Sequence, residues 1–386
     1  MLMVSQLFEL SRGLWLEVQL SSPPWLRRTL VQTLGEAKDV ARQLGKPYLS
    51  LYQWEGQGKG GPLTVNHAGL GHAKPFLKSI LFVEEPTERQ IGQVRVWYPS
   101  ELAHLSNGDI TIIHANKHLI RYLPGRNALI LPAYVDMILD VQGDWQDVQG
   151  RFRKSVRKEL RLTKKYDYQY EVSHGSQGFD MFYHDMYLPT MESRHGALAS
   201  LIPTREAYQY FRHGLLFLVK RNGRYVCGSI FYIERDTVHF MLMGVLNGDQ
   251  RWIEEGAVGA LNYLRIQWAH QKGYKAVNFG GCRPFVTGLF SYKRKWGTAV
   301  TIPPQENNRI WIKIQRNTSA VSQFLKSNPC LTLGNGGGLQ VLVVTDDPDN
   351  VTSDTEAAWH KLYATPGLSS LLVRSVANLM GKSNFQ

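Results

Sequence analysis

The sequence predicts an α/β or α+β fold in which helices flank a mixed β-sheet. Helical and strand-like segments alternate along the chain, and the middle third has the order β-β-β-α-β. At 386 residues the chain exceeds the size at which a single hydrophobic core usually stops growing. We therefore expect two related lobes, at 1–150 and 151–302, and a small C-terminal subdomain at 303–386.

The N-terminal lobe is expected to combine one amphipathic helix with several strands. Apolar residues at helical spacing predict the helix at 24–44. Alternation of apolar and polar residues predicts strands at 48–54, 93–98, 109–114 and 128–131.

Three antiparallel strands are the most clearly predicted part of the chain. They are expected at 215–220, 224–234 and 237–245. Asn222-Gly223 between the first two is a strong hairpin signal, because both residues tolerate the backbone conformation of a tight turn. A helix over about 254–272 then leads to a strand at 276–279, and such a crossover predicts that this strand is parallel to a neighbour.

The segment 145–165 is predicted to be a strongly cationic helix with one apolar stripe. Its cations are Arg151, Arg153, Lys154, Arg157, Lys158, Arg161, Lys164 and Lys165. The whole chain has a formal net charge of +12, which attracts polyanions. The helix at 151–165 is therefore a candidate surface for RNA, DNA or an anionic membrane, and a merely solvated face is the alternative.

The C-terminal part changes character beyond Pro303-Pro304. Its pattern predicts a helix near 310–326, an apolar strand at 339–344 and a last helix near 368–380. We expect these elements to form the appended subdomain.

Several protein classes lack support in the sequence. Three scattered cysteines, Cys227, Cys282 and Cys330, form neither a metal knuckle nor a disulfide framework, which fits a reducing cytoplasm. No run approaches the roughly 18 apolar residues of a spanning helix. There is no HExxH, GxSxG or strand-linked GxGxxG motif. We expect a cytoplasmic protein with no metal and no integral membrane segment, and leave open its attachment to the inner membrane surface.

The run from Asn278 to Gly297 is the sharpest functional signal. Gly280-Gly281 ends a strand and permits the close approach of a ligand or of backbone. Lys293, Arg294 and Lys295 follow beside aromatic residues and supply positive charge. A strand exit followed by a solvated basic loop is the alternative.

Three segments resemble those of FemAB-type transferases and related members of the GNAT superfamily. Tyr292-Lys-Arg-Lys-Trp-Gly297 resembles the closing run that follows a glycine-ended strand in that group. Phe152–Arg161 resembles its early basic helix, and Tyr187–Gly196 resembles a later helix. The resemblance implies a GNAT-like fold for 151–302, and 1–150 is then expected to be a degenerate unit of the same kind.

The resemblance also implies where an activated donor binds. In GNAT-like proteins two strands splay apart and a helix N-terminus receives the donor's phosphates; here 237–245 and 276–279 would be the splayed pair. Donor contacts are expected from Gly256, Gly259, Gly280, Gly281, Arg283 and Lys295. Glu254 and Glu255 depart from the family pattern, because carboxylates there would repel a pyrophosphate. Simple capping of the helix is the alternative explanation for these two acids.

For catalysis the expected residues are Lys293, Glu192 and Arg194. Lys293 would offset the charge on the reacting carbonyl or leaving group, and Glu192 with Arg194 would bind the acceptor or remove its proton. His195 and His239 are further candidates.

The expected function is transfer of an acyl or aminoacyl group to an amine on a cell-envelope precursor, polysaccharide or metabolite. No tightly bound cofactor is expected; acyl-CoA is the expected cosubstrate, with aminoacyl-tRNA as the alternative. The competing hypothesis is a non-catalytic protein that binds nucleic acid or an anionic membrane on a GNAT-like scaffold.

Overall fold

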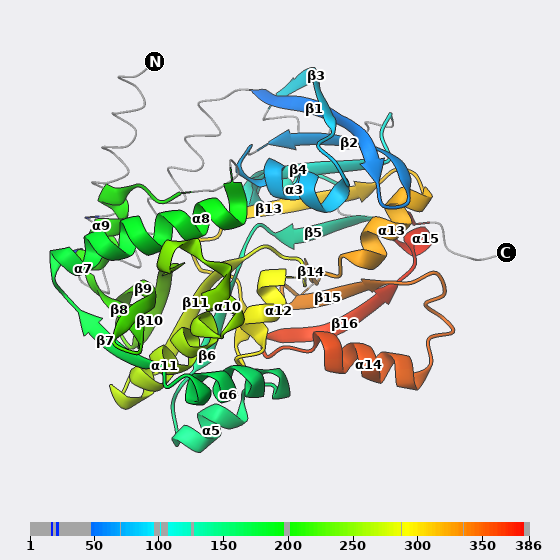
Figure 1. Cartoon of the computed structure of the whole chain (residues 1–386). Helices are drawn as coiled ribbons and strands as arrows, with labels where there is room; N and C mark the ends of the chain where they lie inside the picture. Colours follow the sequence, from blue (N-terminus) through cyan, green and yellow to red (C-terminus); the bar gives the residue numbers. More distant parts are fainter. Residues whose placement is uncertain are drawn as a thin grey trace, which may run out of the picture. The chain divides into compact units, whose positions relative to one another are not determined.

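The computed structural model describes residues 48–69, 71–95, 107–124, 127–196, 201–286, 288–334 and 336–381, together with positions 17, 21, 22 and 101 (Figure 1). These residues fall into two compact units. The first consists mainly of 136–280 and 292–299, and the second mainly of 48–135, 281–291 and 300–381.

The first unit is built on a mixed sheet. Its strands are β6 (Val135–Asp140), β7 (Gln169–Ser173), β8 (Gly214–Arg221), β9 (Arg224–Glu234), β10 (Thr237–Val245) and β11 (Ala276–Cys282). They lie in the order β6-β11-β10-β9-β8-β7. The run β7 to β10 is antiparallel, whereas β10 and β11 are parallel. The predicted mixed sheet and its parallel pair are thus confirmed.

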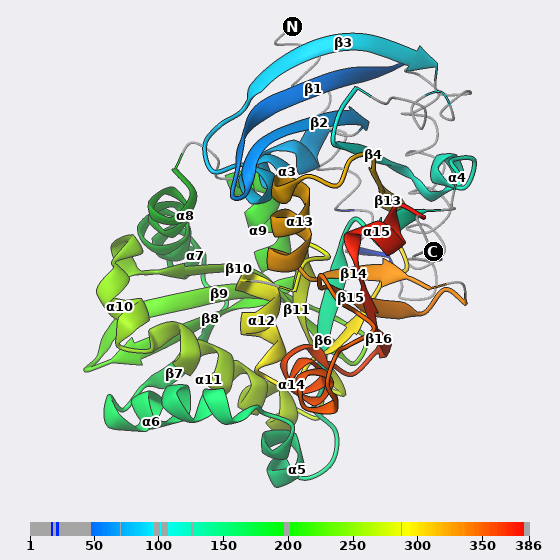
Figure 2. The same ribbon diagram turned by 90° about the vertical axis from the view of Figure 1, so that its right-hand side faces the viewer.

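Helices cover both faces of this sheet (Figures 1 and 2). The helices are α5 (Trp145–Gly150), α6 (Arg157–Lys165), α7 (Ser176–Met181), α8 (Leu188–His195), α9 (Thr204–Arg212), α10 (Gln250–Glu254) and α11 (Ala257–Gln271). A π-helical turn, Phe182–Tyr187, joins α7 to α8. α7, α8 and α9 lie on one face, and α11 with α6 lies on the other. Within the described part of the chain, no helix is both long and apolar enough to cross a membrane.

The β8–β9 hairpin forms where the sequence predicts it. Asn222 and Gly223 have φ values of 49° and 75°, so both central residues of the turn are left-handed. This conformation matches the twist of the flanking strands and suits asparagine followed by glycine. The turn fixes the register Arg221↔Arg224 and leaves both arginines at one end of the sheet.

The second unit contains two sheets. Six strands have the order β3-β1-β2-β4-β13-β5, and three have the order β14-β15-β16. The strands are β1 (Tyr48–Gly58), β2 (Gly61–Gly69), β3 (Thr87–Arg95), β4 (Ile110–Asn116), β5 (Ala128–Pro132), β13 (Asn308–Ile314), β14 (Cys330–Leu333), β15 (Leu339–Val344) and β16 (Leu368–Arg374). Its helices are α3 (Lys74–Leu81), α4 (Lys117–Ile120), α13 (Ser319–Ser327), α14 (Ser353–Tyr363) and α15 (Val376–Leu379). α3 and α13 contribute to the main core of this unit.

Two C-terminal segments differ from the predicted helices. The segment from 308 to 314 is a strand, because Ile310, Ile312 and Ile314 alternate into one core while Trp311 packs into another. Likewise 368–374 is the strand β16, paired with β15. β-branched residues at period two favour a strand when both faces are covered.

The order of the two units also differs from the predicted consecutive segments. β13 lies between β4 and β5, so residues beyond 303 complete the sheet of the N-terminal lobe. β6 of the first unit also lies before position 150 in the chain. Long-range strand pairing of this kind leaves no signal in local periodicity.

The predicted cationic helix at 145–165 is interrupted. The chain leaves α5 at Gly150 and re-enters a helix at Lys154–Val156 and α6. Between them, the Arg153 backbone N–H donates to the Lys295 carbonyl at 2.8 Å, which ties this link to the run Tyr292–Gly297. The predicted helix at 24–44 lies outside the described residues.

Candidate functional site

The parallel strands β10 and β11 pair only over their first residues. The register runs Thr237↔Ala276, Val238↔Val277 and His239↔Asn278, and pairing stops there although both strands continue. Gly280 has a φ of 78°, and a Cβ at this position would lie 3.3 Å from the Phe240 carbonyl oxygen. The backbone that follows the last pair therefore requires glycine, and polar groups gather at this point.

Asn278 connects three elements at the end of the pairing. Its Nδ2 donates to Asp136 Oδ2 of β6 at 2.9 Å and lies 3.4 Å from His239 Nδ1 of β10. Its Oδ1 accepts the Gly280 backbone N–H at 2.7 Å. The amide thus holds a carboxylate, an imidazole and the glycine turn in one arrangement.

Asp136 is a partly buried carboxylate in this arrangement. Burial raises its pKa above the ordinary aspartate value, while the hydrogen bond from Asn278 and the charge of Lys293 act in the opposite direction. A carboxylate with a raised pKa is a better proton acceptor than a solvated one, which is the property that a general base needs.

Lys293 lies in α12 (Gly288–Arg294) and is buried, with an exposed fraction of 8%. Its Nζ donates to the Gly280 carbonyl oxygen at 3.0 Å. The positive charge of Lys293 also acts on Asp136 and lowers the pKa of that carboxyl. The bond to Gly280 therefore puts Lys293 of the run Tyr292–Gly297 in direct contact with the glycine-ended strand β11.

His239 is held from two further sides. Its ring stacks on Tyr232, with centroids 4.6 Å apart, and its Nε2 lies 3.8 Å from Glu234 Oε2. Asp136 and Glu234 are thus the two ends of a series of side-chain contacts that runs through Asn278 and His239.

A buried polar network supports the site from α11. Arg265 donates to Ser229 Oγ at 3.0 Å, pairs with Asn262, and lies 3.4 Å from the Phe240 ring centroid. Asn262 in turn donates to the Tyr292 hydroxyl at 2.6 Å. Burial lowers the pKa of Arg265 to about 9 and raises that of Tyr292 to about 12. The network fixes α12, and with it Lys293, against the sheet.

The structure brings Gly256 and Gly259 against α6. A Cβ on Gly256 would lie 2.8 Å from Leu162 Cβ, and one on Gly259 would overlap the side chain of Glu159. Lys295, also expected at the donor, forms an ion pair with Glu159 and lies 4.2 Å from the Tyr292 ring centroid. Close helix packing therefore accounts for both glycines without a ligand.

The remaining predicted residues lie on α8, directly after Gly280 on β11, or in the second unit. Glu192 and Arg194 are exposed on α8, and within the described residues no hydrogen bond or ion pair joins either to Lys293. Gly281 is exposed, and Arg283 belongs to the second unit, where its guanidinium lies 4.0 Å from the Tyr134 ring centroid. The side chain of His195 is outside the described set.

Asp136 and the role of Asn278 were missed by sequence reasoning. A signal existed, because Asp136 stands inside the apolar run Val135-Asp-Met-Ile-Leu, where an acid is unusual in a strand. The bond to Asn278 spans 142 residues, so only the fold could show which partner that acid meets.

Metal or thiol chemistry is not indicated by the described residues. Among them, no group of three or more His, Cys, Asp and Glu side chains could hold a metal ion. Cys227, Cys282 and Cys330 are buried free thiols, and burial raises the pKa of Cys227 and of Cys330 to about 12.

Comparison with known proteins identifies the class. Residues 150–294 match the model of the acetyltransferase (GNAT) domain, which includes the β10–β11 pair and Lys293. The resemblance to the GNAT superfamily is thus confirmed for this segment, and the protein is an acyltransferase with its donor and acceptor unspecified.

Solved structures give weaker likenesses. FemX is 12% identical with a TM-score of 0.39, covering 76% of this chain and 96% of its own. The C-terminal domain of a putative lysylphosphatidylglycerol synthetase from Agrobacterium fabrum is 13% identical with a TM-score of 0.33, covering 69% and 81%. At this level the likenesses carry no inference about function. A search of curated proteins gave no match.

Proposed function

We propose that the protein transfers an acyl or aminoacyl group from an activated donor to an amine at the point where β10 and β11 separate. One observation carries this proposal: Asp136, Asn278, His239 and Lys293, from four elements, gather where the pairing of two strands ends. That arrangement lies within the segment matched by the acetyltransferase model, apart from Asp136 on β6.

The chemistry assigns each charged group one task. An amine with a pKa of about 10 must lose a proton before its nitrogen attacks the donor carbonyl, and Asp136 is the base that would accept the proton. The carbon–nitrogen bond forms as the carbonyl oxygen gains negative charge, which the Lys293 ammonium would stabilise. The bond to the leaving thiolate or alkoxide then breaks, the attached nitrogen loses its excess proton to become an amide, and the leaving group takes up a proton in return.

The donor is proposed to be acyl-CoA or an aminoacyl-tRNA, used as a cosubstrate. The acceptor is proposed to be an amine on a cell-envelope precursor, a polysaccharide or a metabolite. We propose that the donor contacts Gly280. Because glycine has no side chain, the space beside Lys293 Nζ stays open to the donor.

The test is a transfer assay with the purified full-length chain, preceded by a thermal-shift screen of acyl-CoA species and charged tRNA. A ligand at 100 times its dissociation constant should stabilise the fold by about 2.7 kcal/mol. Product formation that needs both a donor and an amine supports the proposal. If neither class of donor is consumed with any amine acceptor, the proposal fails.

Polyanion binding is a second candidate role, favoured by α6. Five cations on this helix are exposed: Arg157, Lys158, Arg161, Lys164 and Lys165. If they bind RNA, DNA or an anionic membrane, replacing three of them with glutamine should flatten the dependence of affinity on salt. An unchanged slope would leave α6 as a solvated face.

A further inference from the structure

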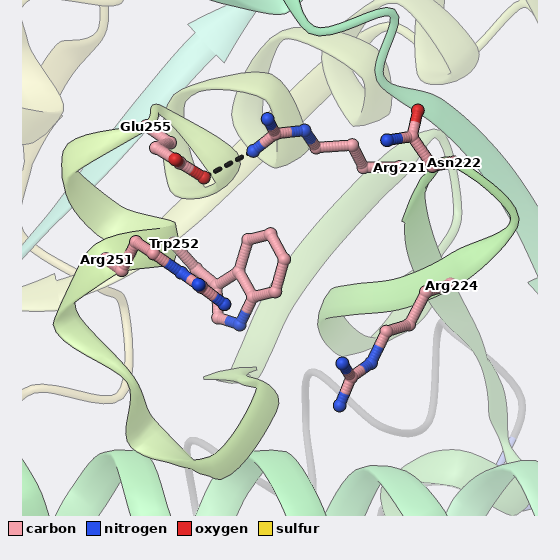
Figure 3. A pocket seen from close by; sticks show the side chains of 6 residues that line it. All are labelled: Arg221, Asn222, Arg224, Arg251, Trp252 and Glu255. Carbon is pink, nitrogen blue, oxygen red and sulfur yellow. Dashed lines mark hydrogen bonds and ion pairs between the residues drawn. The ribbon is translucent and has the colours of Figure 1, made fainter.

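A side chain that can ionise normally has a charged or hydrogen-bonded partner when it is buried or partly buried. Figure 3 shows such a case in the first unit, where the Arg221 guanidinium of β8 pairs with the Glu255 carboxylate. His67 of β2, in the second unit, differs. Its exposed fraction is 0%, and within the described part of the chain neither Nδ1 nor Nε2 has a hydrogen-bond partner. The fold therefore holds a polar ring in its core without satisfying it.

The His67 ring lies on the face of the sheet that α3 covers. It stacks on the Trp54 ring of β1, with centroids 4.7 Å apart and an angle of 14° between the ring planes. Leu77 and Leu81 of α3 belong to the same core cluster as Trp54. The stacked pair is therefore kept from water by α3.

The charged groups that act on His67 come from α3. Burial, and then the positive charges of Lys74 and Lys78, lower the pKa of His67 to about 3. Glu88 of β3 is already engaged by three donors: Lys74 and Lys78, each at 3.2 Å, and the Trp54 Nε1–H at 2.9 Å. A proton on His67 would therefore add a third cation beside two lysines that share one carboxylate.

The two strands that flank β2 contribute no carboxylate next to His67 over their described lengths. On β1, Tyr52 is the register partner of His67, and Lys74 Nζ lies 3.2 Å from the Tyr52 ring centroid. On β4, Ile112 is the register partner, and the next side chain along that face is His114. Protonated His67 would thus be a buried cation without a described carboxylate to accept its N–H groups.

We propose that His67 is an acid-sensitive latch, so that protonation of its ring releases α3 from the β1–β2 face while the first unit stays folded. The ring takes up a proton only after α3 has moved away and water reaches it. The packed state is therefore favoured fully above the ordinary histidine pKa of 6.5, and this preference declines as the pH falls towards 3. Because α3 has only eight residues, it should lose its helical hydrogen bonds once it is released.

The test follows amide hydrogen exchange at residues 74–81 of the full-length protein between pH 7.5 and pH 4.5. In the wild type the equilibrium constant for opening α3 should rise about 100-fold over this range, because opening takes up one proton and each pH unit below 6.5 then contributes about tenfold. His67→Phe keeps a ring that can stack but cannot be protonated, and its constant should change little. Variants are compared at the same pH, so the intrinsic exchange rates cancel.

Two controls isolate the histidine. His118→Phe removes an exposed histidine of the same unit and should leave the rise in place. Residues 257–271 of α11, in the first unit, should exchange alike in all variants at each pH. Although burial acts in the opposite direction, hydrogen bonds from Lys78 and Lys74 lower the pKa of Glu88 below its ordinary value of 4.5, so protonation of Glu88 weakens the contacts of α3 only below the tested range.

A wild-type opening constant that stays flat down to pH 4.5 overturns the latch, as does a rise of the same size in His67→Phe. A second variant without a titrating ring, His67→Leu, serves the same comparison if the phenylalanine variant does not fold. A rise that appears equally in α11 would mean general acid unfolding and would also overturn the proposal. No donor or acceptor is present, so each outcome is independent of the proposed transferase function.

Discussion

Replacing Asp136 with asparagine should lower the catalytic rate without lowering the stability of the fold. Asparagine keeps the shape of the side chain and an oxygen that can accept the bond from Asn278, but it cannot accept a proton. Loss of a general base typically costs 100-fold to 10,000-fold in rate, which is about 2.7–5.5 kcal/mol of transition-state free energy. We expect kcat for amine acylation to fall by at least about 100-fold.

The free energy of unfolding of Asp136→Asn should not fall with the catalytic rate. Because the pKa of Asp136 is raised in the fold, the folded state holds this proton more tightly than the unfolded chain does. This tighter proton binding stabilises the fold at pH values below the ordinary aspartate pKa of about 3.9. The stabilisation is lost as the pH rises through the raised pKa of Asp136. Asp136→Asn should therefore be at least as stable as the wild type at pH 7, with its relative advantage growing from acid to neutral pH.

The assay combines steady-state kinetics across pH with urea denaturation at each pH. Asp140→Asn is the matched control, since Asp140 is an exposed acid on the same strand and should leave kcat unchanged. Wild-type activity should fall as pH drops through the raised pKa of Asp136, and Lys293→Met should move that limb to higher pH because it removes a charge that lowers this pKa. Full turnover in Asp136→Asn would refute the assignment of the base.

Three further predictions concern neighbouring contacts. Lys293→Met should reduce kcat by about 100-fold, or about 3 kcal/mol, and retained turnover would remove its assigned role. Gly259→Ala should lower the free energy of unfolding by about 1–3 kcal/mol in urea denaturation, because its new methyl group would overlap the side chain of Glu159. Gly150→Ala is the control and should change this free energy little, because no atom lies within 4 Å of a Cβ at that position. Equal effects of the two substitutions would contradict close packing of Gly259 against α6. Lys295→Met should cost about 1–3 kcal/mol on the same assay because it leaves the partly buried Glu159 unpaired; an unchanged midpoint would mean that the pair contributes nothing.

Local sequence patterns were sufficient to predict the main strands of residues 150–294. Strands β8, β9 and β10 lie where alternation predicts them, and the Asn222-Gly223 turn follows from the φ values that these residues tolerate. The parallel placement of β11 follows from the crossover helix before it. These features depend on residues close in the chain, so periodicity and turn chemistry are sufficient to find them.

The partners of the polar residues depend on contacts between segments that are far apart in the chain. Asp136 reaches Asn278 across 142 residues, and β13 enters the N-terminal sheet from beyond 303. Gly256 was expected to face a donor phosphate, yet its space is taken by Leu162 of α6. Periodicity assigns a residue to a helix or strand and to one of its faces, but pairing between distant segments decides which groups share a site. Burial in that site then sets whether a carboxylate such as Asp136 can act as a base.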